Sequence, residues 1–523
     1  MRYRILACAL ASFALAGACL AANPASPHQE KTPQVRIVTR LVTLNVIVQD
    51  KNGRPVAGPS RKDFSVYDGG RKQKIAYFET PNPQEAGRPF VQEPPDVYSN
   101  IGAGGGPPGV IIILVDSLNM DFTAQYYARE AVIRFLEQIP PNQRVAIYLL
   151  GMHLTVLHDF TSDVAGLITA LRKSHVDLSH EIGRSTRIPP MPEPPGLAGQ
   201  ALQALNASIK QGAGMQGTYF GYLRFDITLG ALNQIAERVA GAPGRKSLIW
   251  LTGSLPFCFC EADQSLGPSQ SREVNATRRL LSSENLAVYP VDARGLMVGE
   301  SSTDFAMKEV AKATGGVAFH DTNDILGSVR RAAQDADDSY VLGYYPSGVK
   351  WNGKFRKVEV KVSRPGLRVR TQSGYYATAT LPVQVGNLAQ IAKEPLEETA
   401  VPLTVKVAPE PPSKPRRIRL FVAFDPKNIH LADSSLGRVA SLELGLFQES
   451  ATGKILASRV EGFKLLANGA PSERPGKESL GLTVPVPLFP AASRLVLVLR
   501  DETTGAIGSI DIPLEKYQRE PAR

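Results

Sequence analysis

The sequence predicts an α/β protein in which a doubly wound, Rossmann-like domain is inserted into a β-sandwich and followed by a second β-sandwich. Residues 109–338 alternate short apolar runs with helix-like segments, as in a largely parallel sheet covered by helices. Residues 35–79 and 339–378 hold short alternating strands that cannot close a core separately, so we expect them to pair. Residues 400–513 repeat alternating strands and turns, which is typical of an antiparallel sandwich.

The opening strand of the α/β domain is the most informative segment. Residues 110–115 are continuously apolar and end abruptly in Asp116. Such a run predicts a strand that is buried on both faces, within a parallel sheet. Ligands of these sheets bind outside the carboxyl ends of the strands, so Asp116 is placed where a ligand would be held.

The remaining elements follow from periodicity and turn signals. Residues 80–108 are rich in proline and glycine and predict a linker. Residues 177–217, proline-rich and then rich in glycine and glutamine, break the alternation and predict a surface insertion. In the α/β domain we expect strands at 109–116, 144–151, 247–252, 286–291 and 316–320, and helices at 123–138, 164–173, 228–240, 271–284, 304–313 and 323–336.

The N-terminus predicts export. Two arginines precede an apolar run and small residues, as in a signal peptide over residues 1–22. The segment that ends in Cys19 resembles a bacterial lipobox, so two outcomes stay open: lipidation of Cys19 or plain cleavage near Ala22. No later run of about 18 apolar residues follows, so a lipid anchor is the only membrane attachment that we expect. The expected location is the periplasm, the outer envelope or the extracellular space.

Composition narrows the function classes. The net charge of +10 is spread over 523 residues with no basic and aromatic stripe, which argues against nucleic-acid binding. Cys258 and Cys260 are separated by one residue, and export favours a local disulfide over free thiols and over a metal site. The sequence also lacks a Gly-x-Ser-x-Gly elbow, a His-Glu-x-x-His motif and a phosphate-binding loop.

The α/β domain resembles a von Willebrand factor A domain. The resemblance rests on the strand that ends in Asp116, the helix after it, and the segment 244–253. The fuller pattern is closer to the secreted von Willebrand A-related proteins of acidobacteria and covers residues 35–378. Its further carriers are the strand 44–48, the turn Asn52-Gly53-Arg54-Pro55-Val56 and the motif Asp63-Phe64-Ser65-Val66-Tyr67-Asp68-Gly69.

The resemblance implies a metal-ion-dependent adhesion site for Mg²⁺, here in degenerate form. The family motif is Asp-x-Ser-x-Ser, a later threonine and a late aspartate. Asp116 matches the aspartate, and the threonine is Thr228 or Thr218. Leu118 and Met120 stand at the serine positions and Gly253 at the late aspartate, while Ser117 and Asn119 offer oxygens at shifted positions. The expected ligands are therefore Asp116, Asn119 and Thr228, with weak Mg²⁺ binding at most. The alternative is that Asp116 caps the next helix.

The sequence thus predicts an exported, non-enzymatic protein of the binding or adhesion type, which presents its carboxyl-end loops to an unidentified protein partner. Two alternatives stay open. One is an envelope hydrolase with a site in the 177–217 insertion or in the β domains. The other is a structural lipoprotein of the cell envelope that is anchored through Cys19.

Overall fold

The computed structural model describes residues 42–81, 94–100, 109–140, 143, 145–161, 163–174, 219–242, 245–260, 266–297, 301–377, 387–394, 396–411, 415–424, 426–434, 437–467 and 480–518. The signal peptide 1–22, Cys19, Thr218 and the insertion 177–217 lie outside these residues. Within them, no helix combines the length and the apolar character needed to cross a bilayer.

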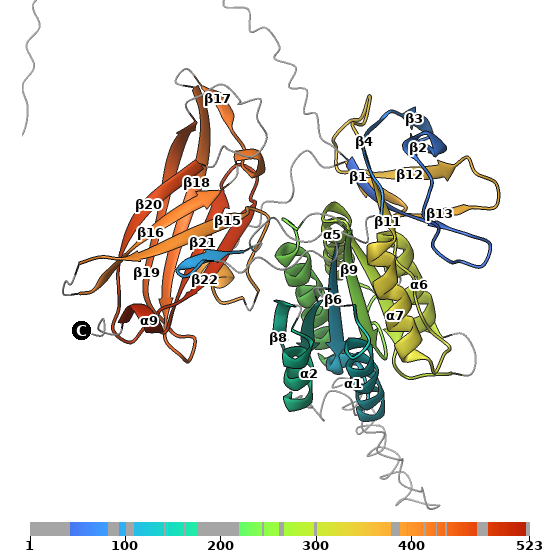
Figure 1. The fold of residues 1–523 in the computed structure, drawn as a ribbon, viewed down its shortest axis with the longest axis horizontal. Coiled ribbons are helices and arrows are strands. Elements are labelled where there is room, and N and C mark those ends of the chain that lie inside the picture. The colour runs from blue at the N-terminus through green and yellow to red at the C-terminus, as the bar shows by residue number, and fades with distance from the viewer. Residues whose placement is uncertain are drawn as a thin grey trace, which may run out of the picture. The chain divides into compact units, whose positions relative to one another are not determined.

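A five-stranded sheet forms the centre of the α/β domain, in the order β10-β9-β6-β7-β8. Figure 1 labels its strands β6, β8 and β9. Four strands are parallel, and β8 runs antiparallel to β7 at one edge. Since the side chains of β6 from 110 to 116 are all buried, the apolar run does occupy the middle of a two-sided core. The strands are β6 (Gly109–Asp116), β7 (Val145–Leu150), β8 (Leu154–Thr161), β9 (Arg245–Thr252) and β10 (Leu286–Asp292).

Helices cover both faces of this sheet, because successive side chains of β6 point to opposite sides. Ile111 and Ile113 pack with one set of helices, and Ile112 and Leu114 with the other. The first set comprises α1 (Phe122–Leu136), α2 (Val164–Lys173) and α7 (Ile325–Asp337). The second comprises the helical residues 219–238, α5 (Pro268–Ser283) and α6 (Ser302–Thr314).

The structure differs from the expected sheet at two places. Residues 316–320 do not form a strand, and only Phe319 makes an isolated parallel bridge, to Val291 of β10. The edge strand β8 was not expected at all. Most side chains of β8 after Leu154 are only partly buried. The sequence of this strand therefore need not be continuously apolar, and it lacks the run that marks a buried strand.

Strands from before and after the α/β domain share two sheets, of order β13-β1-β11-β4 and β14-β12-β2-β3. Leu44 of β1 faces Leu342 of β11, and both point into one apolar core that also contains Val66 of β2. The strands are β1 (Val42–Gln49), β2 (Phe64–Asp68), β3 (Arg71–Gln73), β4 (Ile75–Glu79), β11 (Ser339–Tyr344), β12 (Phe355–Val362), β13 (Arg368–Arg370) and β14 (Gly374–Tyr376).

Two antiparallel sheets enclose the C-terminal core, of order β20-β16-β15-β5 and β17-β18-β21-β22, with β19 paired to β18. One strand corrects the linker prediction for residues 80–108, because Tyr98 of β5 pairs with Val405 of β15. The strands are β5 (Val97–Ser99), β15 (Leu403–Pro409), β16 (Arg417–Phe424), β17 (Ala432–Ser434), β18 (Gly437–Glu449), β19 (Ile455–Ala467), β20 (Leu480–Pro487), β21 (Arg494–Asp501) and β22 (Ile507–Pro513).

The segment that leads into β15 is built onto the α/β domain. Leu396 is buried in the core formed with helix 219–238. The Thr399 hydroxyl donates a hydrogen bond to the Arg238 carbonyl (2.6 Å) and accepts one from the Gly241 amide (2.9 Å). A side chain at Gly241 would collide with the Thr399 carbonyl, so this close approach requires glycine.

Candidate functional site

Asp116 ends the central strand β6 and is fully buried. Its Oδ2 accepts hydrogen bonds from Trp250 Nε1 (3.0 Å) and Thr252 Oγ1 (2.9 Å). Asn119 supplies further donors, through its backbone amide to Oδ1 (3.1 Å) and through its side-chain Nδ2 to both carboxylate oxygens (3.2 and 2.9 Å). Asp116 therefore caps the short 3-10 turn η2 (Ser117–Asn119) and bonds to two residues of β9.

Asn119 brings the three predicted site residues together. Its Nδ2 also donates to Oγ1 of Thr228 (3.0 Å), which is fully buried on helix 219–238. We call Asp116, Asn119, Thr228, Trp250 and Thr252 the Asp116 cluster. Asn119 turns its N–H groups toward Asp116 and Thr228. The three residues therefore do not direct oxygen atoms at one common metal position.

The other positions of the family motif are occupied by packing residues. Leu118 is buried in one core of the α/β domain and Met120 in the other. A Cβ atom at Gly253 would lie 3.0 Å from the Asn119 carbonyl oxygen, so an aspartate there would need the loop to shift. These three positions offer no side-chain oxygen.

The cluster does not fit the Mg²⁺ ion that the resemblance to von Willebrand factor A domains implies. Mg²⁺ demands near-octahedral oxygen ligands and usually keeps water molecules and one or two carboxylates. Here one carboxylate accepts bonds from four N–H or O–H groups. The buried oxygens left without a hydrogen-bond partner within the described residues of this loop are Ser117 Oγ and Asn119 Oδ1, and both are neutral.

Burial controls the charge of the cluster. It raises the pKa of Asp116 to about 6, while the hydrogen bonds from Asn119, Thr252 and Trp250 limit the rise. Asp116 is therefore ionised at neutral pH, as the four donors require, and takes up a proton below about pH 6.

Trp250 and Thr252 were missed as site residues. The signal that could have found them is strand register, because β9 lies beside β6 with Leu114 opposite Trp250. Residues two apart share a face of a strand, so Trp250 and Thr252 of β9 lie on the same side as Asp116 of β6. Since the sequence did not reveal which strand neighbours β6, this pairing could not be used.

Cys258 and Cys260 are joined by a disulfide in the loop after β9. Phe257 and Phe259 stack with their ring centroids 5.7 Å apart, and both are buried in the core that contains Trp250. The disulfide loop is therefore packed down at the carboxyl end of β9.

Large apolar side chains are exposed where the chain leaves the carboxyl ends of β6, β7 and β10. Phe122 follows β6 and is 68% exposed, and Met152 follows β7. Leu296, 66% exposed, and Met297 follow β10, and Phe305 lies in the first turn of α6, the next helix. Because parallel strands end at one edge of the sheet, these loops share that edge. We call these five residues and their loops the carboxyl-end face.

Comparisons with known proteins find weak similarity to solved structures alone. No protein-family model matches the chain, and none of the curated proteins compared with it does. Similar solved structures include a von Willebrand factor type A protein from Catenulispora acidiphila (12% identity, TM-score 0.26, 83% of this chain and 75% of that one). An aerotolerance-related membrane protein from Bacteroides fragilis is 13% identical, with a TM-score of 0.26 over 44% of this chain and 98% of that one. The pilus adhesin SpaC from Lactobacillus rhamnosus GG is 9% identical, with a TM-score of 0.25 over 88% of this chain and 62% of that one. By its own strand order, the chain has a mixed α/β fold, with a parallel-cored sheet covered by helices and several antiparallel sheets.

Proposed function

We propose that the chain is an exported, non-enzymatic binding protein whose α/β domain holds a protein partner at its carboxyl-end face. The observation that carries the proposal is the exposure of Phe122, Leu296 and Phe305 at one edge of the sheet. Exposed apolar groups gathered in this way mark interaction sites in soluble proteins, and aromatic residues are enriched in protein interfaces.

The loops of this face are held in place, which favours binding because little conformational freedom is then lost. Asp121 caps α1 immediately before Phe122, with its carboxylate 2.8 Å from the Ala124 amide. Asn323 Oδ1 accepts a hydrogen bond from the Leu296 amide (2.9 Å). The Ser301 hydroxyl caps α6 just before Phe305.

The first test replaces two apolar side chains of this face. In the Phe122→Ala/Leu296→Ala variant we expect the partner, isolated by pull-down from an envelope extract, to bind at least about tenfold more weakly, since interface hot spots cost about 2 kcal/mol or more each. Titration calorimetry with the isolated partner measures the change. The matched control is Phe421→Ala, which removes an exposed aromatic ring of β16 in the C-terminal sheets. Equal weakening of partner binding in both variants would contradict an interface at the carboxyl-end face.

The second test concerns metal independence. Because the Asp116 cluster is satisfied by internal donors, millimolar Mg²⁺ should leave the unfolding of the α/β domain unchanged, and a chelator should leave partner binding unchanged. Thermal unfolding with and without MgCl₂ measures the first effect. A rise of several degrees that disappears in Asp116→Ala would establish a working adhesion-type metal site and overturn this part of the proposal.

Export and anchoring form a separate part of the proposal, supported by the basic and apolar character of residues 1–22. We expect the wild-type protein to be recovered outside the cytoplasm. Membrane fractionation of the wild type and of a Cys19→Ala variant decides between a lipid-anchored and a released form, since only lipidation makes membrane recovery depend on Cys19.

A pocket favours a second candidate function, the binding or hydrolysis of a small molecule. Its volume is about 340 Å³, and its polar lining includes Glu237, Glu398, Arg279 and Asn285. Concave sites with a few converging polar groups are typical of small-molecule sites. Hydrolysis of ester, peptide or glycoside substrates that is lost in Glu398→Gln but kept in Asp116→Ala would establish this second function.

A further inference from the structure

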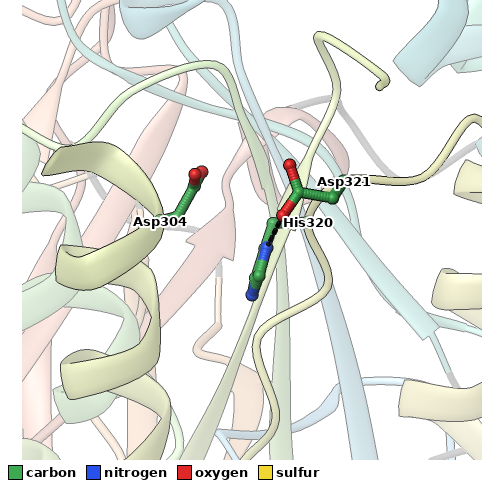
Figure 2. A group of neighbouring side chains, drawn as sticks. All are labelled: Asp304, His320 and Asp321. Carbon is green, nitrogen blue, oxygen red and sulfur yellow. Dashed lines mark hydrogen bonds and ion pairs between the residues drawn. The ribbon is translucent and has the colours of Figure 1, made fainter. Parts of the chain in front are cut away.

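Three potential metal ligands meet near the carboxyl end of β10, apart from the Asp116 cluster. They are Asp304, His320 and Asp321, and their ligand atoms all lie within 4.8 Å of one another. Figure 2 shows Asp304 on its helix and the His320–Asp321 pair on the facing segment. Phe319, the residue before His320, bridges to Val291 of β10, and this contact places the pair beside α6.

Asp304 contributes a buried oxygen that lacks a hydrogen bond. The residue is fully buried in the first turn of α6, and its Oδ2 accepts a hydrogen bond from the Ser301 amide (2.7 Å). Its Oδ1 has no hydrogen-bond partner within the described residues. Arg294 Nη2 lies 3.6 Å from that oxygen and makes a closer ion pair with Asp292, at 2.6 Å. An unsatisfied buried carboxylate oxygen is costly, so a ligand that contacts it would stabilise the fold.

His320 and Asp321 supply the accessible side of the group. Their side chains are 19% and 41% exposed, and His320 Nδ1 lies 2.7 Å from Asp321 Oδ2. Asp321 has a left-handed backbone conformation (φ 54°), which aspartate and asparagine tolerate better than most residues. A solvent-derived ion can therefore reach the pair without opening the core.

We propose that Asp304, His320 and Asp321 form a binding site for a divalent transition metal ion, with Zn²⁺ as its best occupant. One imidazole nitrogen and two carboxylate oxygens match the donors that Zn²⁺ uses, at about 2.0–2.2 Å, and three protein ligands leave a fourth position for water or another group. An imidazole ligand makes Mg²⁺ and Ca²⁺ poorer candidates, since these ions favour all-oxygen sites. On binding, the His320–Asp321 hydrogen bond is replaced by two bonds to the metal.

A metal here would tie the start of α6 to the segment before α7. That segment includes Asn323, which holds the Leu296 amide in place. The Asn323 side chain holds this amide without a metal, so partner binding does not require the metal. The site itself stands independently of partner binding, because it rests on its own ligands.

The test is Zn²⁺ binding to the full, untagged chain under non-reducing conditions, so that Cys258 and Cys260 remain paired. Titration calorimetry and metal analysis after desalting are run on the wild type, His320→Ala and Asp321→Asn. The asparagine keeps a residue that tolerates the left-handed conformation. His153→Ala, an exposed histidine elsewhere in the domain, is the matched control. Far-ultraviolet circular dichroism confirms that each variant is folded.

We expect one Zn²⁺ per wild-type chain and an unchanged affinity in His153→Ala. Affinity should fall at least about tenfold in His320→Ala and in Asp321→Asn, since the loss of even an outer-shell partner costs about 10- to 100-fold. Cobalt should bind to the same site and give a visible absorption band that is lost in His320→Ala. Absence of Zn²⁺ binding to the wild type, or binding that is indifferent to His320, overturns the proposal.

Discussion

Lowering the pH from 8 to 5 is expected to raise the melting temperature of the α/β domain, the reverse of the usual acid response. The cause is a group of carboxyl groups near the end of helix 219–238, where Glu398 is buried and Glu237 and Glu397 are partly buried. Burial raises the pKa of Glu237 to about 7, and the nearby charge of Glu394 adds to the rise. Burial also raises the pKa of Glu397 to about 7, although Arg238 opposes it. Burial and the charge of Glu237 raise the pKa of Glu398 well above its ordinary value.

The sign follows from proton linkage. A carboxyl group with a pKa of about 7 in the folded state and 4.5 in the unfolded state binds its proton more tightly when folded. Its contribution to stability is complete below about pH 4.5 and is lost as the pH rises to about 7. For Glu397 the shift corresponds to about 3 kcal/mol of stability. Asp116, with a pKa of about 6, acts in the same direction between about pH 4 and 6.

Trp250 fluorescence reports this change in the α/β domain. Since the chain has two tryptophans, a Trp351→Phe background leaves Trp250 as the sole reporter. In that background Glu398→Gln should raise stability at pH 8 and reduce the dependence on pH, because a neutral amide removes the buried charge. Glu359→Gln, which changes an exposed side chain of β12, should leave both unchanged. A melting temperature that falls steadily from pH 8 to 5 would show that these carboxyl groups are hydrated and ionised in the folded protein.

Replacing Asp116 by alanine is expected to destabilise the α/β domain by about 3 kcal/mol at pH 7.5. The change leaves Trp250 Nε1 and the Asn119 amide without their acceptor inside the core. Each buried donor that loses its acceptor costs about 1–3 kcal/mol, and relief of the buried charge offsets part of the sum. Denaturant unfolding followed by Trp250 fluorescence measures the loss.

The matched control is Asp163→Ala. Asp163 caps α2 at the surface through a hydrogen bond from the Gly166 amide (3.0 Å), so its loss should cost about 1 kcal/mol. Asp116→Asn should fall between the two, since the amide keeps one acceptor and turns an N–H group toward the Trp250 donor. Equal small losses in all three variants would show that water replaces the Asp116 carboxylate and that the cluster is not sealed from solvent.

The central part of the fold could be predicted because its signals are local. The apolar run before Asp116 marks a strand buried on both faces, and the helices around it show apolar periodicity. β5 gave no such signal, because three residues are too few for a periodic pattern and their pairing with β15 is a long-range contact. β8 was hidden because its edge position leaves its side chains only partly buried.

The candidate sites were predictable only in part, for the same physical reason. Asp116 and Asn119 are close in sequence, and a resemblance supplied Thr228. Trp250 and Thr252 join them through strand register. Asp304 and His320 come together through the bridge at Phe319, where the sequence had predicted a full strand. Glu398 reaches Glu237 because the segment around Leu396 packs into the core of the α/β domain, which no local pattern announces.

Site-specific photo-crosslinking tests most directly the central claim that the carboxyl-end face binds a protein without a metal. A benzoylphenylalanine is placed at Phe122 or Phe305, and at Phe421 or Tyr345 as exposed aromatic controls elsewhere in the chain. After irradiation in envelope extract, we predict the same crosslinked protein from positions 122 and 305, equally strong with and without chelator, and little from 421 and 345. Crosslinks that form only from the control positions, or that disappear with both chelator and Asp116→Ala, would contradict the claim.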